Sequence, residues 1–414
     1  MEIFLRGGGF ANKGAEALLK TVKQELEKRI PSVEFHAIVQ GSQATAATHA
    51  GFLPHTERTA LEFWLYHLGR CPVPVKGCRN VARRLQAHRQ IRLLHECDAV
   101  LDVSGYAYSD TFVAYPMRLA KDIVSGCHDI GISYVFLPQA WGPFTKSFSQ
   151  QAIRHMAERA VLLYARDKTS LQHLRSIPDI PLGKLELAPD IVLKFRPCEI
   201  HKNLDPLEKS GLLVKEKPLV GICPNIRIYR ATERHGIGPN NPYVRWMVDL
   251  CNALLTETDA HIVLFPHEID MRLWRKDDRH VCRFVQQALQ TTERVRVFLE
   301  PCSADTLKLL IQQLDLLVGS RFHSIIAALS LCVPTVAMGW SHKYQEVMND
   351  AGVGELAFSY KAMNSGAAIT SVLETWANRE QVRHRLQESV PLLQRKVDDV
   401  FDRVAEILRN TQCH

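Results

Sequence analysis

The stretch "LDLLVGSRFHSIIAAL", Leu314 to Leu329, reads as a buried strand, a turn and the first turns of a helix. Gly319 and Ser320 form the turn, which places Arg321 and His323 in the first helical turn. The helix macrodipole favours negative charge at this end and opposes a cation. An anionic ligand at the helix N-terminus would explain Arg321. The alternatives are that Arg321 reaches solvent or pairs with a nearby acid, and that His323 is an ordinary polar residue.

Strand-like and helix-like segments alternate on both sides of this stretch. The strand-like runs are "EIFLR", "VEFHAIV", "AVLDVS", "ISYVFLP" and "VLLYARD" in the first half, and "LVGICPN", "HIVLFPHE", "VRVFLE", "DLLVG" and "PTVAMG" in the second. Such alternation predicts parallel sheets covered by helices, and 414 residues are too many for one ordinary core. The predicted fold class is α/β, with two doubly wound Rossmann-like domains that face a central cleft.

Composition along the chain sets the predicted domain boundaries. Residues 1–195 form an N-terminal domain, the polar, Pro-containing segment 196–217 is a linker, and residues 218–375 form a C-terminal domain. Residues 376–414 read as a C-terminal helix that packs back across the domains. Ligands of open α/β sheets bind beyond the carboxyl ends of the strands. The candidate loops are therefore 7–14, 104–110, 139–144, 225–230, 267–270, 320–324 and 339–344.

Three of these loops contain motifs whose chemistry can be judged directly. In "NIRIYR", Arg227 and Arg230 could grip a phosphate or carboxylate, or could be ordinary surface arginines. The opening "GGGFANKGAE" fits neither the dinucleotide fingerprint nor the P-loop and predicts only a tight strand-to-helix turn. "HEIDMRLW" has Met271 where a zinc motif needs its second histidine, so His267 is expected to be a structural histidine or to face the cleft.

The overall composition excludes several classes of protein. No apolar run is long enough to cross a bilayer, and the first residues lack the pattern of a signal peptide. The eleven cysteines are scattered, which predicts reduced thiols and a cytoplasmic protein without a metal site. The basic segment 79–96 could touch an anionic membrane or an acidic glycan, or could be a solvated helix face. No motif supports nucleic-acid binding.

Taken together, the site loops resemble the polysaccharide pyruvyl transferase family, which transfers pyruvate from phosphoenolpyruvate (PEP) to a sugar as a cyclic ketal. "GGGFANKGAEALL" is similar to the family's G-x-x-N-x-G-D turn and helix, and "DVSGYAYSD" to its second glycine loop. "LPQAWGPF", "ARDKTSLQHL" and "APDIVLKF" resemble its Q-x-x-G-P-F, R-D-x-x-S and P-D motifs. The most specific likeness is the R-x-H-x-x-I-x-A box in "GSRFHSIIAALSLCVPTVAMGWSHKYQEVMNDAG".

The resemblance implies a GT-B-like fold and a transferase that uses PEP as its donor substrate, with no metal or other cofactor. It implies that His323 supplies a proton to PEP and that Arg321 binds its anionic groups. The PEP-binding residues would be Arg227, Arg230, Ser320, Arg321, His323 and Lys343. The acceptor-binding residues would be Asn12, Asp110, Gln139, Trp141 and His267, with Glu16 or Asp110 deprotonating a sugar hydroxyl. The expected partners are PEP and a glycan or lipid-linked saccharide, without nucleic acid, and with peripheral contact to the inner face of the membrane as one reading.

Two departures from the family pattern bear on the acceptor and on activity. Ala15 stands where the family usually has aspartate, with Glu16 next to it, and the second glycine loop is poorer in glycine than is usual. Two other functions therefore stay open. One is a GT-B glycosyltransferase that uses a nucleotide sugar, whose diphosphate would face the same helix. The other is a catalytically silent relative that only binds a glycan.

Overall fold

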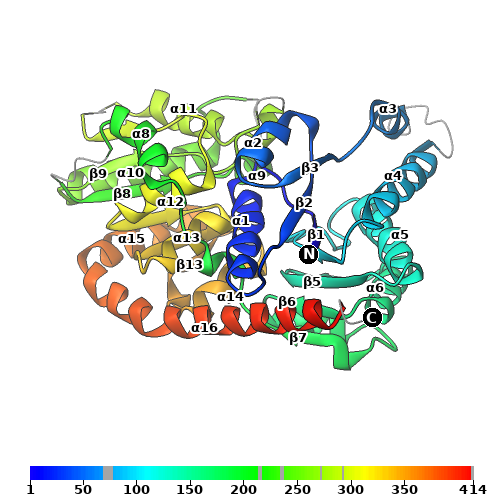
Figure 1. Ribbon diagram of the computed structural model, residues 1–414. Coiled ribbons are helices and arrows are strands. Elements are labelled where there is room, and N and C mark those ends of the chain that lie inside the picture. The colour runs from blue at the N-terminus through cyan, green and yellow to red at the C-terminus, as the bar shows by residue number, and fades with distance from the viewer. Residues whose placement is uncertain (69–77, 213–216, 234–236, 271–272, 291–292, 412–414) are drawn as a thin grey trace. The chain divides into compact units, whose positions relative to one another are not determined.

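The computed structural model describes residues 1–68, 78–212, 217–233, 237–270, 273–290 and 293–411 (Figure 1). It contains two parallel sheets, one of seven strands and one of six, so the predicted α/β class is confirmed. The chain divides into two compact units. Unit 1 comprises Met1–Phe10, Leu18–Ile191 and Lys396–His414, and unit 2 comprises Ala11–Ala17 and Val192–Arg395.

The sheet of unit 1 has the order β3-β2-β1-β4-β5-β6-β7, and all of its strand pairs are parallel. The chain runs outward from the centre in one direction and then in the other, which places the crossover helices on both faces. The central strands are buried on both sides and so read as continuous apolar runs. The strands are β1 (Glu2–Arg6), β2 (Glu34–Val39), β3 (Leu53–Thr56), β4 (Ala99–Asp102), β5 (Ser133–Gln139), β6 (Leu162–Ala165) and β7 (Leu185–Leu187).

The helices of this half pack their apolar faces against that sheet. One buried cluster joins Phe4, Val100 and Phe136 of the strands to Ile123 and Ile153 of the helices. The helices are α1 (Lys13–Glu27), α2 (Ala44–His49), α3 (Ala60–Leu68), α4 (Cys78–Leu94), α5 (Tyr115–Asp129), α6 (Ser147–Arg159) and α7 (Lys168–Arg175).

The sheet of unit 2 has the order β10-β9-β8-β11-β12-β13 and is also entirely parallel. Its strands are β8 (Leu219–Cys223), β9 (His261–Leu264), β10 (Val295–Val297), β11 (Leu316–Gly319), β12 (Thr335–Gly339) and β13 (Ala357–Ser359). The α-helices from residue 200 onward are α8 (Ile200–Lys209), α9 (Ile226–Thr232), α10 (Pro242–Glu257), α11 (Arg279–Ala288), α12 (Ala304–Gln312), α13 (Phe322–Ser330), α14 (His342–Asp350), α15 (Ala367–Ala377) and α16 (Arg379–Thr411). No helix of the described ranges is long and apolar enough to cross a membrane.

The units differ from the sequence-predicted boundaries in three places. Residues 11–17 were assigned to the first domain, but their contacts group them with unit 2. The segment 196–217 was expected to be a linker, yet it contains α8, whose Leu207 is buried against Leu310 and Leu314 of unit 2. The rest of that segment includes residues 213–216, which lie outside the described residues. The helix α16 changes units between Arg395 and Lys396.

A buried charge network joins the carboxyl ends of β1 and β4 at the centre of the first sheet. Arg6 ends β1 and Asp102 ends β4, and their Nη1 and Oδ2 atoms lie 2.8 Å apart. The hydroxyls of Tyr108 and Tyr134 donate to the same carboxylate oxygen at 2.7 and 2.6 Å. Burial raises the pKa of both phenols, with Asp102 adding to the effect, so they stay protonated and donate. The network thereby fixes Tyr108, in the loop after β4, against Asp102 and Arg6.

We expect Asp102→Asn to lower the free energy of unfolding of unit 1 by about 3 kcal/mol or more, because it leaves the charge of Arg6 buried without compensation. Urea denaturation followed by circular dichroism measures the change. The matched control is Asp129→Asn, an exposed aspartate of α5, which should change stability by less than about 0.5 kcal/mol. If the two variants unfold at the same urea concentration, Asp102 does not compensate the buried charge of Arg6.

Candidate functional site

The segment 11–17 forms one side of a site in unit 2. Asn12 caps α1 through its side-chain oxygen, which accepts from the backbone N–H of Gly14 at 2.9 Å. The backbone of this segment pairs with the loop after β9: Lys13 donates to the carbonyl of His267 at 3.2 Å, and Ile269 donates to that of Ala11 at 3.1 Å. The first turn of α1 is thereby fixed against residues 267–269.

Gly14 permits close contact with His323. A Cβ atom at position 14 would lie 2.0 Å from Nδ1 of His323 and 2.6 Å from its Cβ, so any larger residue would displace the ring. His323 is in the first turn of α13, as predicted, and its side chain is partly buried. The glycine of the opening motif therefore sets the position of the proposed proton donor.

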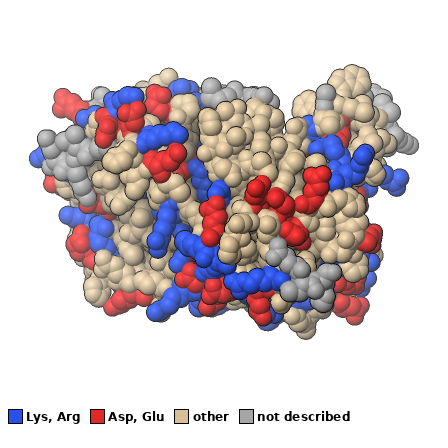
Figure 2. Space-filling model, viewed as in Figure 1, with Lys and Arg blue, Asp and Glu red and all other residues tan. Residues whose placement is uncertain are grey.

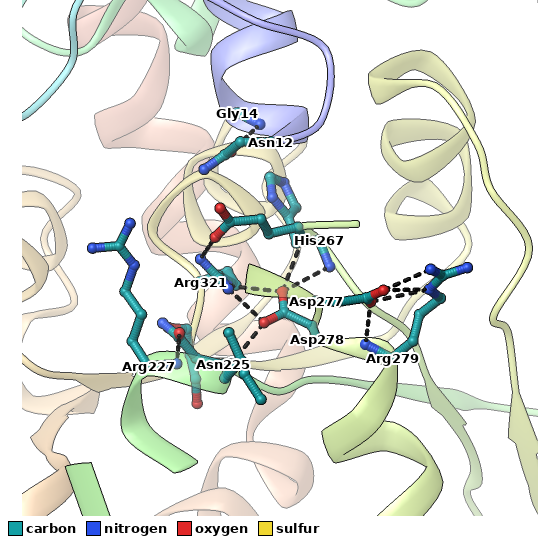
Figure 3. A network of polar contacts seen from close by, with 12 residues as sticks. Asn12, Gly14, Asn225, Arg227, His267, Asp277, Asp278, Arg279 and Arg321 are labelled. Atoms are coloured by element: carbon teal, nitrogen blue, oxygen red, sulfur yellow. Dashed lines mark hydrogen bonds and ion pairs between the residues drawn. The ribbon is translucent and has the colours of Figure 1, made fainter. Parts of the chain in front are cut away.

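Arg321 is held by two carboxylates. Its Nε donates to Oδ2 of Asp278 at 2.8 Å, its Nη2 donates to the other Asp278 oxygen, and its Nη1 donates to Glu268 at 2.5 Å (Figure 3). All three side chains are buried. Burial acts to lower the pKa of Arg321, but the carboxylates outweigh it and the pKa lies above its ordinary value. Arg321 is thus permanently charged, and its extended backbone makes it the N-cap of α13 rather than a residue of the first turn.

Asp278 connects four segments that are far apart in the sequence. Besides Arg321, it accepts from the backbone N–H groups of Ile226 at 2.9 Å, His267 at 3.2 Å and Glu268 at 2.8 Å. It stands immediately before α11 and is completely buried. Glu268 lies in the predicted loop 267–270, whereas Asp278 lies in no predicted loop, and nothing in "HEID" or "RKDDRH" indicates that these acids meet an arginine more than forty residues further on.

Asn225 ties α9 to the turn before α13. Its side-chain oxygen caps α9 by accepting from Arg227 N–H at 2.9 Å, and its amide nitrogen donates to the carbonyl of Ser320 at 2.7 Å. The hydroxyl of Tyr344 donates to the same carbonyl at 3.1 Å. Ser320 is fully buried, and the two hydrogen bonds to its carbonyl hold the turn in place. An asparagine directly after a strand and before a helix is a recognisable cap, which could have identified Asn225.

Two further cations meet at Trp340. Arg227 lies in the first turn of α9, and its guanidinium is 6.0 Å from the Trp340 ring centroid. Lys343 lies in the first turn of α14, with its Nζ 5.1 Å from the same centroid and 4.8 Å from that of Phe322. Arg227 is exposed, and no carboxylate in the described part of the chain forms an ion pair with it. Arg230, also exposed, lies in the last turn of α9.

His267 and Glu16 complete the site on the side of residues 11–17. Burial, followed by the neighbouring His323, Arg321 and Lys13, holds the pKa of His267 well below its ordinary value, so the His267 ring is neutral at physiological pH. Glu16 pairs with Lys13 at 3.0 Å and accepts from the backbone N–H of Ala304 at 3.1 Å. Glu16 thereby anchors α1 to the start of α12, and both of its oxygens are engaged.

The remaining predicted acceptor residues belong to unit 1. Trp141 is completely buried, stacks on Tyr108 at 5.3 Å between centroids and donates from Nε1 to Tyr164 at 2.9 Å. A core tryptophan covered in this way offers no open ring face, so stacking on a sugar would require this packing to open. Gln139 is buried as well. Asp110 accepts from the backbone N–H groups of Thr145 at 2.6 Å and Lys146 at 2.9 Å.

The electrostatics of Asp110 weaken it as a base. Partial burial acts to raise its pKa, but the hydrogen bonds from Lys146, Ser149 and Thr145 outweigh burial and lower the pKa below its ordinary value. In the described ranges, no group of three or more His, Cys, Asp or Glu side chains is arranged to hold a metal ion.

Comparison with known proteins assigns the chain to a family. The model of the family "Polysaccharide pyruvyl transferase" matches residues 12–342, which is most of the chain. The protein therefore belongs to the polysaccharide pyruvyl transferase family. Amylovoran biosynthesis protein AmsJ of Erwinia amylovora is 26% identical over 117 residues, which span 28% of this chain and 28% of that relative.

Solved structures show the fold class independently. The UDP-GlcNAc 2-epimerase from Neisseria meningitidis, bound to UDP-GlcNAc, has a TM-score of 0.59 at 12% identity, covering 98% of this chain and 100% of that one. The S. aureus MnaA–UDP structure has a TM-score of 0.61 at 12% identity, covering 99% and 97%. At such low identity the likeness concerns the fold alone, and it confirms the GT-B-like prediction.

We expect Gly14→Ala to destabilise unit 2 by about 1–3 kcal/mol, because the added methyl overlaps the His323 ring. Thermal unfolding measures the cost, and the shift of the His323 ring resonances in NMR spectra reports the displacement. Gly41→Ala is the matched control, since nothing lies within 4 Å of a Cβ there. The cost should largely disappear in the Gly14→Ala/His323→Ala double variant. An undiminished cost in the double variant would contradict the contact.

Proposed function

We propose that the protein transfers a pyruvyl group from PEP to a sugar of a polysaccharide or glycan precursor, forming a pyruvate ketal. The observation that carries the proposal is the meeting of Arg227 and Lys343 beside the α13 turn that bears His323. Helix N-termini favour anions, and here two of them carry cations as well. A small, strongly anionic substrate such as PEP suits that charge distribution, and membership of the family supports the assignment.

The chemistry follows from the structure of PEP. A proton added to its methylene carbon leaves oxocarbenium character at the central carbon, which a sugar hydroxyl attacks. The bond from that carbon to the phosphate oxygen then breaks, and phosphate leaves. A second hydroxyl of the sugar adds to the same carbon and closes the ketal ring. The two hydroxyls lose one proton each; one balances the proton added to the methylene carbon, and the other is taken up by the phosphate, which leaves as hydrogen phosphate.

His323 is the proposed proton donor, because it is the histidine held in the first turn of α13 by contact with Gly14. His267 is held neutral by burial and its positive neighbours, so it suits acceptance of a hydrogen bond rather than donation of this proton. Asn12 and His267 remain the proposed acceptor contacts in unit 2.

The proposed anion-binding residues differ in how much charge they can offer. Arg321 shares its charge with Asp278 and Glu268, so its main contribution is to fix the turn that carries Ser320 and His323. Arg227 is exposed and faces the Trp340 ring, so it would bind much of the phosphate and carboxylate charge, with Lys343 against the same ring as a second cation. Arg230 would contribute only if PEP extends along α9.

The acceptor is proposed to be a glycan or a lipid-linked saccharide. The name of the relative AmsJ, an amylovoran biosynthesis protein, supports a role in the synthesis of a polysaccharide. Glu16 remains the proposed base for the sugar hydroxyl, with Asp110 as the alternative. Because Asp110 has a lowered pKa and Glu16 has both oxygens engaged, either one would have to exchange a hydrogen bond during the reaction.

We expect Arg227→Gln to weaken PEP binding by about 10- to 100-fold, the loss of a charge-assisted hydrogen bond, without a change in thermal stability. Isothermal titration calorimetry with PEP measures the affinity. Arg245→Gln, an exposed arginine of α10 in the same unit, is the control and should bind PEP as the parent does. If the parent binds a nucleotide sugar and ignores PEP, the glycosyltransferase function is favoured instead.

We expect His323→Gln to keep PEP affinity within a few-fold while lowering turnover by about 10²–10⁴, the usual contribution of a general acid. Phosphate release from PEP in the presence of a glycan panel measures turnover. His49→Gln, an exposed histidine of unit 1, serves as the control. Full activity in His323→Gln would assign the proton to another group, and absence of phosphate release from the parent would favour a silent glycan-binding relative.

A further inference from the structure

Three large apolar residues of the helix α3 are exposed. Trp64 is 65% exposed, Leu61 is 61% exposed and Phe63 is 53% exposed, whereas the acid Glu62 is buried. A helix on the surface of a soluble domain normally has the opposite arrangement, with its charges outside and its apolar residues inside. Leu61 and Trp64 are three residues apart and therefore adjacent on one helix face. Exposed apolar side chains that gather in this way mark a surface that contacts something else.

The neighbouring helix α4 is strongly basic. Between Cys78 and Leu94 it carries five arginines and no acidic residue. Arg79, Arg84 and Arg92 are exposed, as are Val81 and Leu85 on the same helix. Burial, followed by the positive charges of Arg118 and Arg84, lowers the pKa of Arg83. The surface made by Leu61, Phe63, Trp64, Val81, Arg84, Leu85 and Arg92 is called the α3–α4 surface below.

Polar contacts fix the two helices to each other. Glu62 pairs with Nε of Arg89 at 3.1 Å, and Nη2 of Arg89 donates to the carbonyl of Glu57 at 2.9 Å. Gln86 donates to that carbonyl at 2.9 Å, and Arg83 pairs with Asp122 of α5. Figure 1 shows α3 beside α4 at one end of unit 1, and in Figure 2 the blue side chains lie beside tan ones over these helices. Glu62 and Asp122 are thus paired with Arg89 and Arg83, while Arg84 and Arg92 are exposed.

We propose that the α3–α4 surface binds a membrane whose headgroups include anionic phospholipids. Tryptophan, phenylalanine and leucine insert at the boundary between headgroups and acyl chains, and arginine pairs with lipid phosphates. The combination of exposed apolar residues with exposed arginines is complementary to such a membrane. A second copy of the chain would place the arginines of α4 against one another, so charge repulsion disfavours that occupant. The proposal goes beyond the proposed pyruvyl transfer and does not depend on it.

The test uses the full chain and vesicles made either of phosphatidylcholine alone or of phosphatidylcholine with one quarter phosphatidylglycerol, at near-physiological salt. Co-sedimentation gives the partition coefficient, and a blue shift of tryptophan emission reports insertion of Trp64. We expect binding to the anionic vesicles and at least about tenfold weaker binding to the neutral ones. No difference between the two kinds of vesicle, or no binding to either, would overturn the proposal.

Two double variants locate the binding surface. Leu61→Ser/Trp64→Ser should weaken binding to anionic vesicles by about tenfold or more and abolish the blue shift. Arg84→Gln/Arg92→Gln should weaken it by a similar factor. The matched controls are Leu182→Ser/Leu187→Ser, which removes two exposed leucines elsewhere on unit 1, and Lys168→Gln/Arg175→Gln, which removes two exposed charges of α7. Both controls should bind as the parent does.

The replaced side chains are exposed, so the variants should keep the parent's thermal midpoint; Trp64→Ser alone is the fallback if a double variant does not. If the control variants lose as much vesicle binding as the α3–α4 variants, binding depends on charge and apolar residues anywhere on the surface, and the proposal is overturned. Sedimentation velocity tests the other possible occupant, a second copy of the chain. If Leu61→Ser/Trp64→Ser converts a dimer to a monomer and leaves vesicle binding unchanged, the surface joins two copies and the proposal is wrong.

Discussion

The ion pair between Asp278 and Arg321 is the interaction on which the site in unit 2 depends. A buried carboxylate with one arginine and three backbone N–H donors fixes the starts of α9, α11 and α13 and the loop after β9 in one arrangement. Removing either charge would leave the other buried alone, which costs several kcal/mol. The pair therefore constrains the geometry of the site, whether or not Arg321 itself touches a substrate.

This constraint changes how the positive charge of the site is understood. Arg321 was singled out because a cation opposes the macrodipole at a helix start, and the structure places two carboxylates against it. Two other cations of unit 2, Arg227 and Lys343, rest against Trp340. Arg321 thus holds the turn before α13 through its two carboxylate partners.

The segment 11–17 links the opening motif of the chain to that site. Gly14 leaves room for the ring of His323, and the side chain of Asn12 caps α1. The carboxylate of Glu16 accepts a hydrogen bond from the backbone N–H at the start of α12. The departure at Ala15 leaves these contacts in place, because they are made by Asn12, Gly14 and Glu16. A motif at the N-terminus thus contributes its side chains to the C-terminal half of the chain.

The sequence by itself determined the α/β class, the two parallel sheets and the positions of the site loops, because buried parallel strands and helix starts depend on local apolar periodicity and turn residues. It also placed His323 in the first turn of α13. Only the tertiary structure decided that Arg321 meets Asp278 and Glu268, that Trp141 is a core residue, and that α3 exposes Trp64 while burying Glu62. Those outcomes depend on contacts between residues far apart in the chain, and local patterns hold no information about which distant side chain supplies the partner.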